Sequence, residues 1–329
     1  MNWDTISGHA EVVRVLRNLV AANRIPHAML FTGPAGVGKM MTARILAAAL
    51  LCQGKGEVLP CGHCQACKKV LDQSHPDLMV VAGEKGSIKI DQVRTLQQQA
   101  AMVPYYGGRR IFILEDIETM TAQAANSLLK ILEEPPESAT FIMTTVSTHA
   151  LLPTVLSRCR VFSFRALGFE VLTDYLVKRG IDLIAAKAAA RLAGGSIGNA
   201  LALTASPGGL SLRDQAVTLI TQVPDGDLSL VWQTAGEMDK RETGELGHLF
   251  HYMSIIFRDL VMIRMGQREL VFNLDITAQL EEMVNYWSEA GLRQAWKDVN
   301  EAGRALLANA NPRLTYEALM IKCFDAVRE

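Results

Sequence analysis

A glycine-rich segment that ends in a lysine is the first part of this sequence that could do chemistry. It fits the pattern G-x-x-x-x-G-K and reads Gly33-Pro34-Ala35-Gly36-Val37-Gly38-Lys39. The apolar residues 28–31 before it indicate a buried strand, and a helix is expected to open at Met40. Backbone N–H groups in such a loop surround phosphate oxygens, and the lysine reaches the β- and γ-phosphates. The flanking elements favour a phosphate-binding loop over a purely structural glycine turn.

The residue after this lysine departs from the phosphate-loop pattern. A Ser or Thr normally stands there, and its hydroxyl ligates Mg²⁺. Here the residue is Met40, which cannot do so. Thr42 lies two residues further along and points to another face of the expected helix. The segment therefore predicts nucleotide binding that is weak or insensitive to magnesium.

Four cysteines that lie close together in the sequence have the spacing of a metal site. The spacing is C-x8-C-x2-C-x2-C, and the residues are Cys52, Cys61, Cys64 and Cys67. Two such short steps suit a tetrahedral Zn²⁺ ion held by thiolates, and the alternative is a cluster of free or redox-active thiols. His63 could replace one cysteine, but four sulfur ligands already leave no open coordination position. The zinc is therefore expected to be structural.

Strands and helices must alternate in the first half of the chain to position these groups. Short apolar runs predict buried strands at residues 28–31, 78–81, 110–114 and 140–145. A helix is expected from Ala122 to Glu134, where two prolines stop it. This alternation predicts an α/β fold with a parallel sheet wrapped by helices.

The second half of the chain is expected to be helical, and 329 residues suggest two or three domains. Helices are expected at residues 171–179 and 183–193, and Ser196 can cap another. Residues 206–209 (SPGG) form the clearest linker. We expect a P-loop domain at 1–167 with the zinc module at about 52–67, a small helical domain at 168–208, and an all-helical domain at 209–329.

Composition indicates an ordinary globular protein, with 49% hydrophobic and 20% charged residues. The formal net charge of −1 gives no overall basic footprint, so any contact with nucleic acid must be local or shared with partners. The N-terminal residues lack the layout of a signal peptide, and a cytoplasmic location is expected. Cys159 and Cys323 are isolated and are expected to be buried thiols.

Four further segments carry a family likeness. They are residues 26–28 (PHA), 126–136 (NSLLKILEEPP), 157–159 (SRC) and 309–314 (NANPRL). With the phosphate loop, and in this order, they resemble the AAA+ subunits of the bacterial DNA polymerase III clamp loader. The resemblance spans essentially the whole chain and implies a AAA+ domain with an inserted zinc module, a small lid and an all-α collar domain.

Within that family, three departures favour the delta-prime type over the ATP-hydrolysing gamma/tau type. The motor type keeps a Ser or Thr where Met40 stands, an Asp-Glu pair where Glu115-Asp116 stands, and a sensor Arg where Gly198 stands. Each side chain of the Glu115-Asp116 pair differs by one methylene from the Asp-Glu order, so both carboxylates are expected to be displaced. A displacement of catalytic groups by about 1 Å can cost on the order of 100-fold in rate. The chain's own ATPase activity is therefore expected to be absent or very weak. A tau-like chain would also be expected to continue well past the collar.

The resemblance also implies roles for single residues. Arg158 is expected to act as an arginine finger in a neighbouring subunit's ATP site, because its planar fork pairs with phosphate oxygens. The alternative is an ordinary arginine on the surface or in contact with the lid. Thr145 stands where a polar sensor of the γ-phosphate is expected, although Thr is also a common strand residue. Ile6 and Gly8 are expected to border an adenine pocket.

The implied function is that of a delta-prime subunit of the DNA polymerase III holoenzyme, which helps to load the sliding clamp onto primed DNA during replication. The implied partners are gamma/tau and delta subunits in a hetero-pentameric ring, the sliding clamp, and primer-template DNA through the complex, with no membrane. Structural Zn²⁺ is the expected cofactor, and binding of ATP with Mg²⁺ stays open. A gamma/tau-type motor is the alternative. A P-loop ATPase of another pathway is disfavoured by the 126–136 and 309–314 segments.

Overall fold

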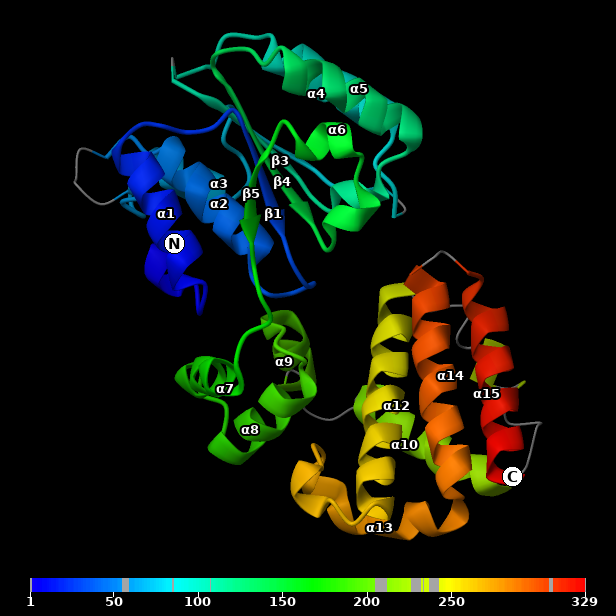
Figure 1. Cartoon of the computed structure of the whole chain (residues 1–329). Helices are drawn as coiled ribbons and strands as arrows, with labels where there is room; N and C mark the ends of the chain where they lie inside the picture. The colour runs from blue at the N-terminus through cyan, green and yellow to red at the C-terminus, as the bar shows by residue number, and fades with distance from the viewer. Residues whose placement is uncertain are drawn as a thin grey trace. The chain divides into compact units, whose positions relative to one another are not determined.

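The chain forms two compact units in a computed structural model (Figure 1). The first unit comprises Met1–Tyr175 with Gly194–Asn199, and the second comprises Leu176–Ala193 with Ala200–Glu329. The structure describes residues 2–328 apart from 55–58, 85, 107, 205–211, 226–231, 233, 237–242 and 308–309. The expected linker at 206–209, and Asn309 of the expected collar segment, lie outside the described residues.

A five-stranded parallel sheet forms the centre of the first unit, with strand order β2-β3-β4-β1-β5. Helices cover both of its faces, which is why the inner strands read as continuous apolar runs. The α/β class with a parallel sheet, predicted from the sequence, is confirmed. The strands are β1 (Ala28–Thr32), β2 (Leu78–Val81), β3 (Arg110–Leu114), β4 (Ala139–Thr145) and β5 (Arg160–Ser163).

Strand β5 was not predicted from the apolar runs. It lies at the edge of the sheet, and among the described strands it pairs with β1 alone. Of its residues, Phe162 is buried whereas Val161 is 43% exposed. An edge strand that buries one side chain needs no apolar run, so its sequence lacks the signal that identified the inner strands.

Two apolar clusters fill the space between the sheet and its helices. Alternate side chains of a strand point to opposite faces, so Met29 and Ile113 pack with α1 and α2, whereas Leu30 and Leu114 pack with α4 and α5. Figure 1 shows these two pairs of helices on opposite sides of the sheet. The helices are α1 (Ala10–Ala21), α2 (Lys39–Leu50), α3 (Gln65–Leu71), α4 (Ile90–Ala100), α5 (Ala122–Glu133) and α6 (Pro153–Leu156).

Local signals set the helix ends to within one or two residues of expectation. Helix α2 begins at Lys39, one residue before the expected Met40, and α5 ends at Glu133, one residue before the expected end. Ser196 accepts the Asn199 N–H at 3.2 Å, which confirms the predicted cap of α9. The helices that follow the sheet are α7 (Phe169–Lys178), α8 (Leu183–Leu192) and α9 (Ile197–Thr204).

Long helices make up most of the described part of the second unit, as the sequence predicted. They pack around a core in which Phe257 and Trp287 meet edge to face, with ring centroids 5.2 Å apart. The helices are α10 (Leu212–Gln222), α12 (Thr243–Arg264), α13 (Thr277–Met283), α14 (Glu289–Leu307) and α15 (Pro312–Arg328). Asp298 of α14 and Lys322 of α15 form an ion pair at 3.0 Å that joins the last two helices.

One helix among the described residues is long and apolar enough to cross a membrane by length and composition. It is the segment Glu245–Arg264 of α12, and 67% of its apolar window is buried inside the protein. Its apolar side chains, such as Leu249 and Leu260, belong to the core of the second unit. The pattern is that of a buried core helix.

Candidate functional site

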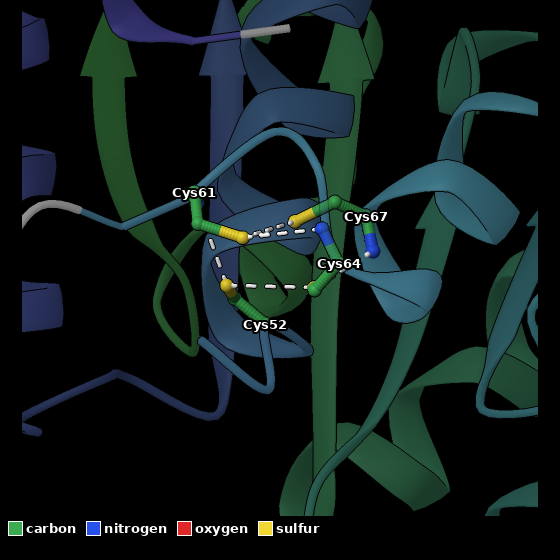
Figure 2. A group of neighbouring side chains, drawn as sticks. All are labelled: Cys52, Cys61, Cys64 and Cys67. Carbon is green, nitrogen blue, oxygen red and sulfur yellow. Dashed lines mark hydrogen bonds between the residues drawn. The ribbon is translucent and has the colours of Figure 1, made fainter. Parts of the chain in front are cut away.

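The four clustered cysteines converge at the far end of α2 (Figure 2). Cys52 follows α2, Cys61 and Cys64 lie in the turn before α3, and Cys67 lies in the first turn of α3. Their sulfur atoms all lie within 4.8 Å of one another, with Cys52 and Cys64 at 3.9 Å and Cys61 and Cys67 at 4.0 Å. A tetrahedral ion with metal–sulfur bonds of about 2.3 Å holds its sulfur atoms roughly 3.8 Å apart. The four thiols therefore fit a single metal ion.

Backbone N–H groups donate to three of these four sulfur atoms. The N–H groups of Gly54 and Cys61 donate to the Cys52 sulfur, and those of Cys64 and Cys67 donate to the sulfurs of Cys61 and Cys64, at 3.3–3.4 Å. Burial disfavours the Cys64 thiolate, but the N–H donors and neighbouring thiols outweigh it and lower the pKa of Cys64 to about 6. Donors of this kind stabilise a thiolate such as that of Cys64, whereas burial raises the pKa of Cys52 and of Cys67.

His63 does not join the cluster. Its Nδ1 lies 2.9 Å from the carbonyl oxygen of Cys61, and the side chain is exposed. The group that could hold a metal ion thus consists of the four cysteines named from the spacing. Of the two isolated cysteines, Cys323 is buried as expected, but Cys159 is only half-buried because it packs at the margin of a core cluster. Burial raises the pKa of the Cys159 thiol to about 11.

The phosphate loop lies at the opposite end of α2, between that helix and β1. Gly33, Gly36 and Gly38 have φ angles of 146°, 72° and 107°, which side chains rarely adopt. The Gly33 N–H donates to the Thr145 carbonyl at 3.2 Å and so fastens the loop to β4. Because α2 has 12 residues, its two ends are about 18 Å apart, and a metal on the cysteines cannot take part in phosphate chemistry.

Lys39 is folded back onto the loop to which it belongs. Its Nζ donates to the carbonyl oxygens of Gly33 at 2.6 Å and Pro34 at 2.8 Å. Burial lowers the pKa of Lys39, and the carboxylates of Asp116, Glu118 and Glu115 oppose that shift. The ammonium group that would meet a phosphate is therefore already bonded within the chain.

Three carboxylates follow β3 near this lysine. Burial raises the pKa of Glu115, and the nearby Asp116 charge adds to the shift. Burial also raises the pKa of Asp116, helped by Glu118, whereas Lys39 and a hydrogen bond from Thr144 oppose it. Glu118 was not singled out in the sequence, yet its Oε1 accepts the Val146 N–H at 2.9 Å and so holds the loop after β4. A Glu in a connecting segment carries no signal for such a contact.

The threonine hydroxyl groups beside the phosphate loop also form hydrogen bonds within the chain. Met40 packs partly against the core cluster of α2. Thr42 is buried, and its hydroxyl donates to the Gly38 carbonyl at 2.9 Å. The Thr145 hydroxyl donates to the Ser147 carbonyl at 2.9 Å and accepts the Ser147 N–H at 3.2 Å. These bonds give Thr42 and Thr145 local structural roles, and the sensor role of Thr145 stays a prediction.

Backbone from α9 touches the crest of the phosphate loop. The Gly198 N–H donates to the Gly36 carbonyl at 3.1 Å, and a Cβ atom on Gly198 would lie 3.4 Å from the Gly36 Cα. A Cβ atom on Gly36 would collide with the Ser196 hydroxyl. Because Gly36 and Gly198 face each other without side chains, the backbone of α9 can lie against the phosphate loop. Gly198 stands at the position where the family resemblance implies a sensor Arg. Neither the sequence around Gly36 nor that around Gly198 predicts this long-range contact.

His9 adds a further contact to the same loop. Its Nε2 lies 3.1 Å from the Val37 carbonyl, and its ring meets Phe164 edge to face with centroids 4.8 Å apart. Burial lowers the pKa of His9, and the hydrogen bond to Val37 opposes the shift. His9 was not named among the candidate residues, because a single His beside Gly8 has no diagnostic spacing. The neighbouring Gly8 lies close to Leu167.

Arg158 lies on the segment between α6 and β5. Its guanidinium forms an ion pair with Glu133 at 2.8 Å and donates to the Thr154 carbonyl at 2.9 Å and to the Ser157 hydroxyl at 3.3 Å. The side chain is 33% exposed. These contacts are with α5, α6 and the neighbouring residue, so the described contacts of Arg158 are not with the chain's own phosphate loop.

The carboxyl edge of the sheet brings most predicted nucleotide-site residues together. The phosphate loop follows β1, Glu115 and Asp116 follow β3, and Thr145 ends β4, which pairs with β1 through Thr32. Ligand sites of open parallel sheets lie at this edge. The first unit is therefore a P-loop domain with a separate four-cysteine cluster.

Comparison with known proteins places this class of domain in a family. The family model described as DNA polymerase III, delta subunit, matches residues 8–168. The chain is 27% identical over 314 residues to DNA polymerase III subunit delta′ of Bacillus subtilis, covering 94% of each chain. It is 42% identical over 135 residues to subunit delta′ of Pseudomonas aeruginosa, covering 40% of this chain and 41% of that one.

The tau subunit is also similar, but over less of its length. DNA polymerase III subunit tau of Bacillus subtilis is 24% identical over 350 aligned residues, which cover 97% of this chain and 61% of tau. The chain belongs to the family of DNA polymerase III delta′ subunits, which is related to the gamma/tau clamp-loader subunits.

Proposed function

We propose that the chain acts as the delta′ subunit of a DNA polymerase III clamp loader and supports ATP-dependent loading of the sliding clamp during replication. The observation that carries this proposal is the match to a delta′ subunit over 94% of both chains. The replacement of the magnesium ligand by Met40 agrees with a subunit that does not itself hydrolyse ATP. Its expected partners are gamma/tau and delta subunits, the clamp and primer-template DNA, in the cytoplasm.

The four-cysteine cluster is proposed to hold one structural Zn²⁺ ion. Four sulfur atoms within 4.8 Å of one another support the assignment, and no ligand position is left for a substrate. The ion would join the end of α2 to α3, because Cys52 and Cys67 lie on opposite sides of the intervening loop. Its contribution is to folding of this module rather than to phosphate chemistry.

Arg158 is proposed to act in trans on a neighbouring motor subunit. Support comes from the Ser157-Arg158-Cys159 triplet and from a partly exposed guanidinium that its own chain holds in place. An arginine that reaches a neighbour's γ-phosphate stabilises the charge that develops during transfer. The chain's own P-loop, with Gly33, Lys39 and the pair Glu115-Asp116, would bind nucleotide weakly and serve mainly as structure.

Substitution of Arg158 tests this function. In a complex reconstituted with gamma/tau and delta subunits of the same organism, Arg158→Ala should leave assembly unchanged by gel filtration. DNA-stimulated ATP hydrolysis and clamp loading should fall by about tenfold, less than the roughly 10³–10⁵ that a finger supplies at one site, because several motor sites act in one ring. The neighbouring Arg160→Ala is the matched control and should load clamps normally. Wild-type loading by the Arg158 variant would contradict the role.

A gamma/tau-type motor is the second candidate, because the G-x-x-x-x-G-K loop is complete from Gly33 to Lys39. A motor hydrolyses ATP on its own site, whereas a delta′-type subunit does not. Steady ATP turnover by the isolated chain that disappears in Lys39→Ala would favour the motor.

A further inference from the structure

The guanidinium of Arg158 lies where the carboxyl ends of two helices meet. Helix α6 ends at Leu156, and its Thr154 carbonyl accepts one Arg158 N–H at 2.9 Å. Helix α5 ends at Glu133, whose carboxylate lies 2.8 Å from the other terminal nitrogen. The neighbouring Cys159 and Leu156 pack against a core cluster, so the backbone that carries Arg158 is anchored.

Glu133 is the last residue of α5, a position that disfavours a negatively charged side chain. A carboxylate at the C-terminus of a helix faces the negative end of the helix dipole, whereas a cation there is favoured. The Arg158 guanidinium supplies that cation, both for α5 and for the last carbonyls of α6. Glu133 is about half exposed and Arg158 a third exposed, so the pair adds little to stability. Its main physical effect is to restrict the rotamers of a long side chain.

We propose that Glu133 is a positioning residue for Arg158, an inference that rests on the proposed arginine-finger function. Glu133, Thr154 and Ser157 engage three of the five guanidinium N–H groups and leave two to meet phosphate oxygens. A guanidinium held in this way reaches the neighbour's phosphate without first being ordered. Orientation of a group before reaction lowers the barrier, because the entropy of ordering is already lost.

Variants at two adjacent glutamates test this role in the reconstituted complex. Glu133→Ala should lower kcat of the DNA-stimulated ATPase by about two- to tenfold, with KM for ATP little changed, since ordering is lost only for the borrowed arginine. Glu134→Ala is the matched control, because Glu134 is the next residue and is exposed. Glu133→Gln keeps an acceptor oxygen for the guanidinium and should lie between the wild type and Glu133→Ala.

A double variant separates positioning from a merely structural effect. If Glu133 acts through Arg158, Glu133→Ala should have no further effect on ATPase when combined with Arg158→Ala. Equal losses from the Glu133 and Glu134 variants, an increase in rate, or a loss that adds to that of Arg158→Ala would overturn the inference. If Arg158→Ala itself leaves the rate unchanged, the finger function fails instead. The melting temperature of each isolated variant checks that the chain still folds.

Discussion

The two ends of helix α2 carry two candidate sites that differ in what their polar groups are bonded to. At the C-terminal end, the sulfur atoms of Cys52, Cys61, Cys64 and Cys67 lie within 4.8 Å of one another, and backbone N–H groups donate to those of Cys52, Cys61 and Cys64. At the N-terminal end, the phosphate loop also has the expected shape, but Lys39 and several loop carbonyls are already hydrogen-bonded within the chain. Lys39 binds Gly33 and Pro34, and the Gly36 carbonyl accepts an N–H from Gly198.

This difference shows that convergence of a motif is not the same as readiness to bind. A metal ion at the cysteines replaces weak thiol contacts with strong metal–sulfur bonds. A nucleotide at the phosphate loop must first displace hydrogen bonds of Lys39, and each typical hydrogen bond contributes about 0.5–1.5 kcal/mol to stability. The first site is therefore expected to bind its ligand tightly and the second weakly, although both match their sequence patterns.

Loss of the metal should produce the largest effect on stability. Structural zinc contributes about 10–16 kcal/mol of apparent binding free energy in zinc-finger peptides, and that energy is also folding energy. Cys64→Ser, or removal of metal with a chelator, should lower the melting temperature of the chain by about 10 °C or more. The change should be concentrated near residues 52–67, which hydrogen exchange of the Cys61 and Cys67 amides can locate.

Metal content provides the control for this experiment. Purified wild-type chain should carry about one Zn²⁺, and Cys64→Ser should carry much less. Cys159→Ser also removes one thiol but leaves the cluster intact, so it should keep a full equivalent. An absence of metal in the wild type, with all four thiols freely titratable in native protein, would show that the two ends of α2 do not differ as described.

The nucleotide end of α2 should respond to restoration of a single hydroxyl. Met40→Thr supplies the group that ligates Mg²⁺ in P-loop proteins, so it should make nucleotide binding dependent on magnesium and strengthen it by about tenfold. Met41→Thr is the matched control, because Met41 is the adjacent residue and its side chain is 40% exposed. Binding is measured by calorimetry with ATP, with and without Mg²⁺.

Hydrolysis should stay negligible in the Met40 variant. The Glu115-Asp116 order and Gly198 are unchanged in it, and the exchanged order of the two carboxylates is expected to leave them misplaced for water activation. Tight, magnesium-dependent binding by the wild-type chain would break the proposed contrast between the two sites. Binding by Met40→Thr that does not differ from that of Met41→Thr would show that the self-bonded loop, rather than the missing hydroxyl, limits affinity.

The parts of the fold that depend on local sequence could be predicted. Buried inner strands such as β3 are continuous apolar runs, and α5 begins at the Thr121 cap and ends before Pro135, so their bounds agreed with expectation to within one residue. Strand β5 could not be found in this way, because it buries only Phe162 and is defined by its pairing with β1. Edge strands are specified by their neighbours more than by their own pattern.

For the candidate sites too, features that depend on residues close in sequence could be predicted, whereas contacts between distant residues could not. The cysteine spacing of the metal site predicted a convergence that the fold provides, because the four residues are close in sequence. The phosphate loop is also contacted by His9 and Gly198, which are far from it in sequence. Glu118 is similar, since its contact is with Val146 on another strand end. Such contacts between loops have no local signature.

Substitution of Asp116 should have the smallest effect on stability. It tests whether burial of this carboxylate beside the phosphate loop destabilises the folded chain at neutral pH. Burial and the Glu118 carboxylate raise the pKa of Asp116 above its unfolded value, so the folded chain holds this proton more tightly than the unfolded chain does. Stability contributed by the group is therefore present below the unfolded pKa and is lost as pH rises through the folded pKa.

Asp116→Asn removes that loss and should be slightly more stable than the wild type at neutral pH, with the difference vanishing near pH 3.5. Melting temperatures of both proteins across this range, with Asp174→Asn as an exposed control, measure the difference at each pH. A variant that is less stable at neutral pH would mean that Lys39 favours the Asp116 charge more than burial disfavours it.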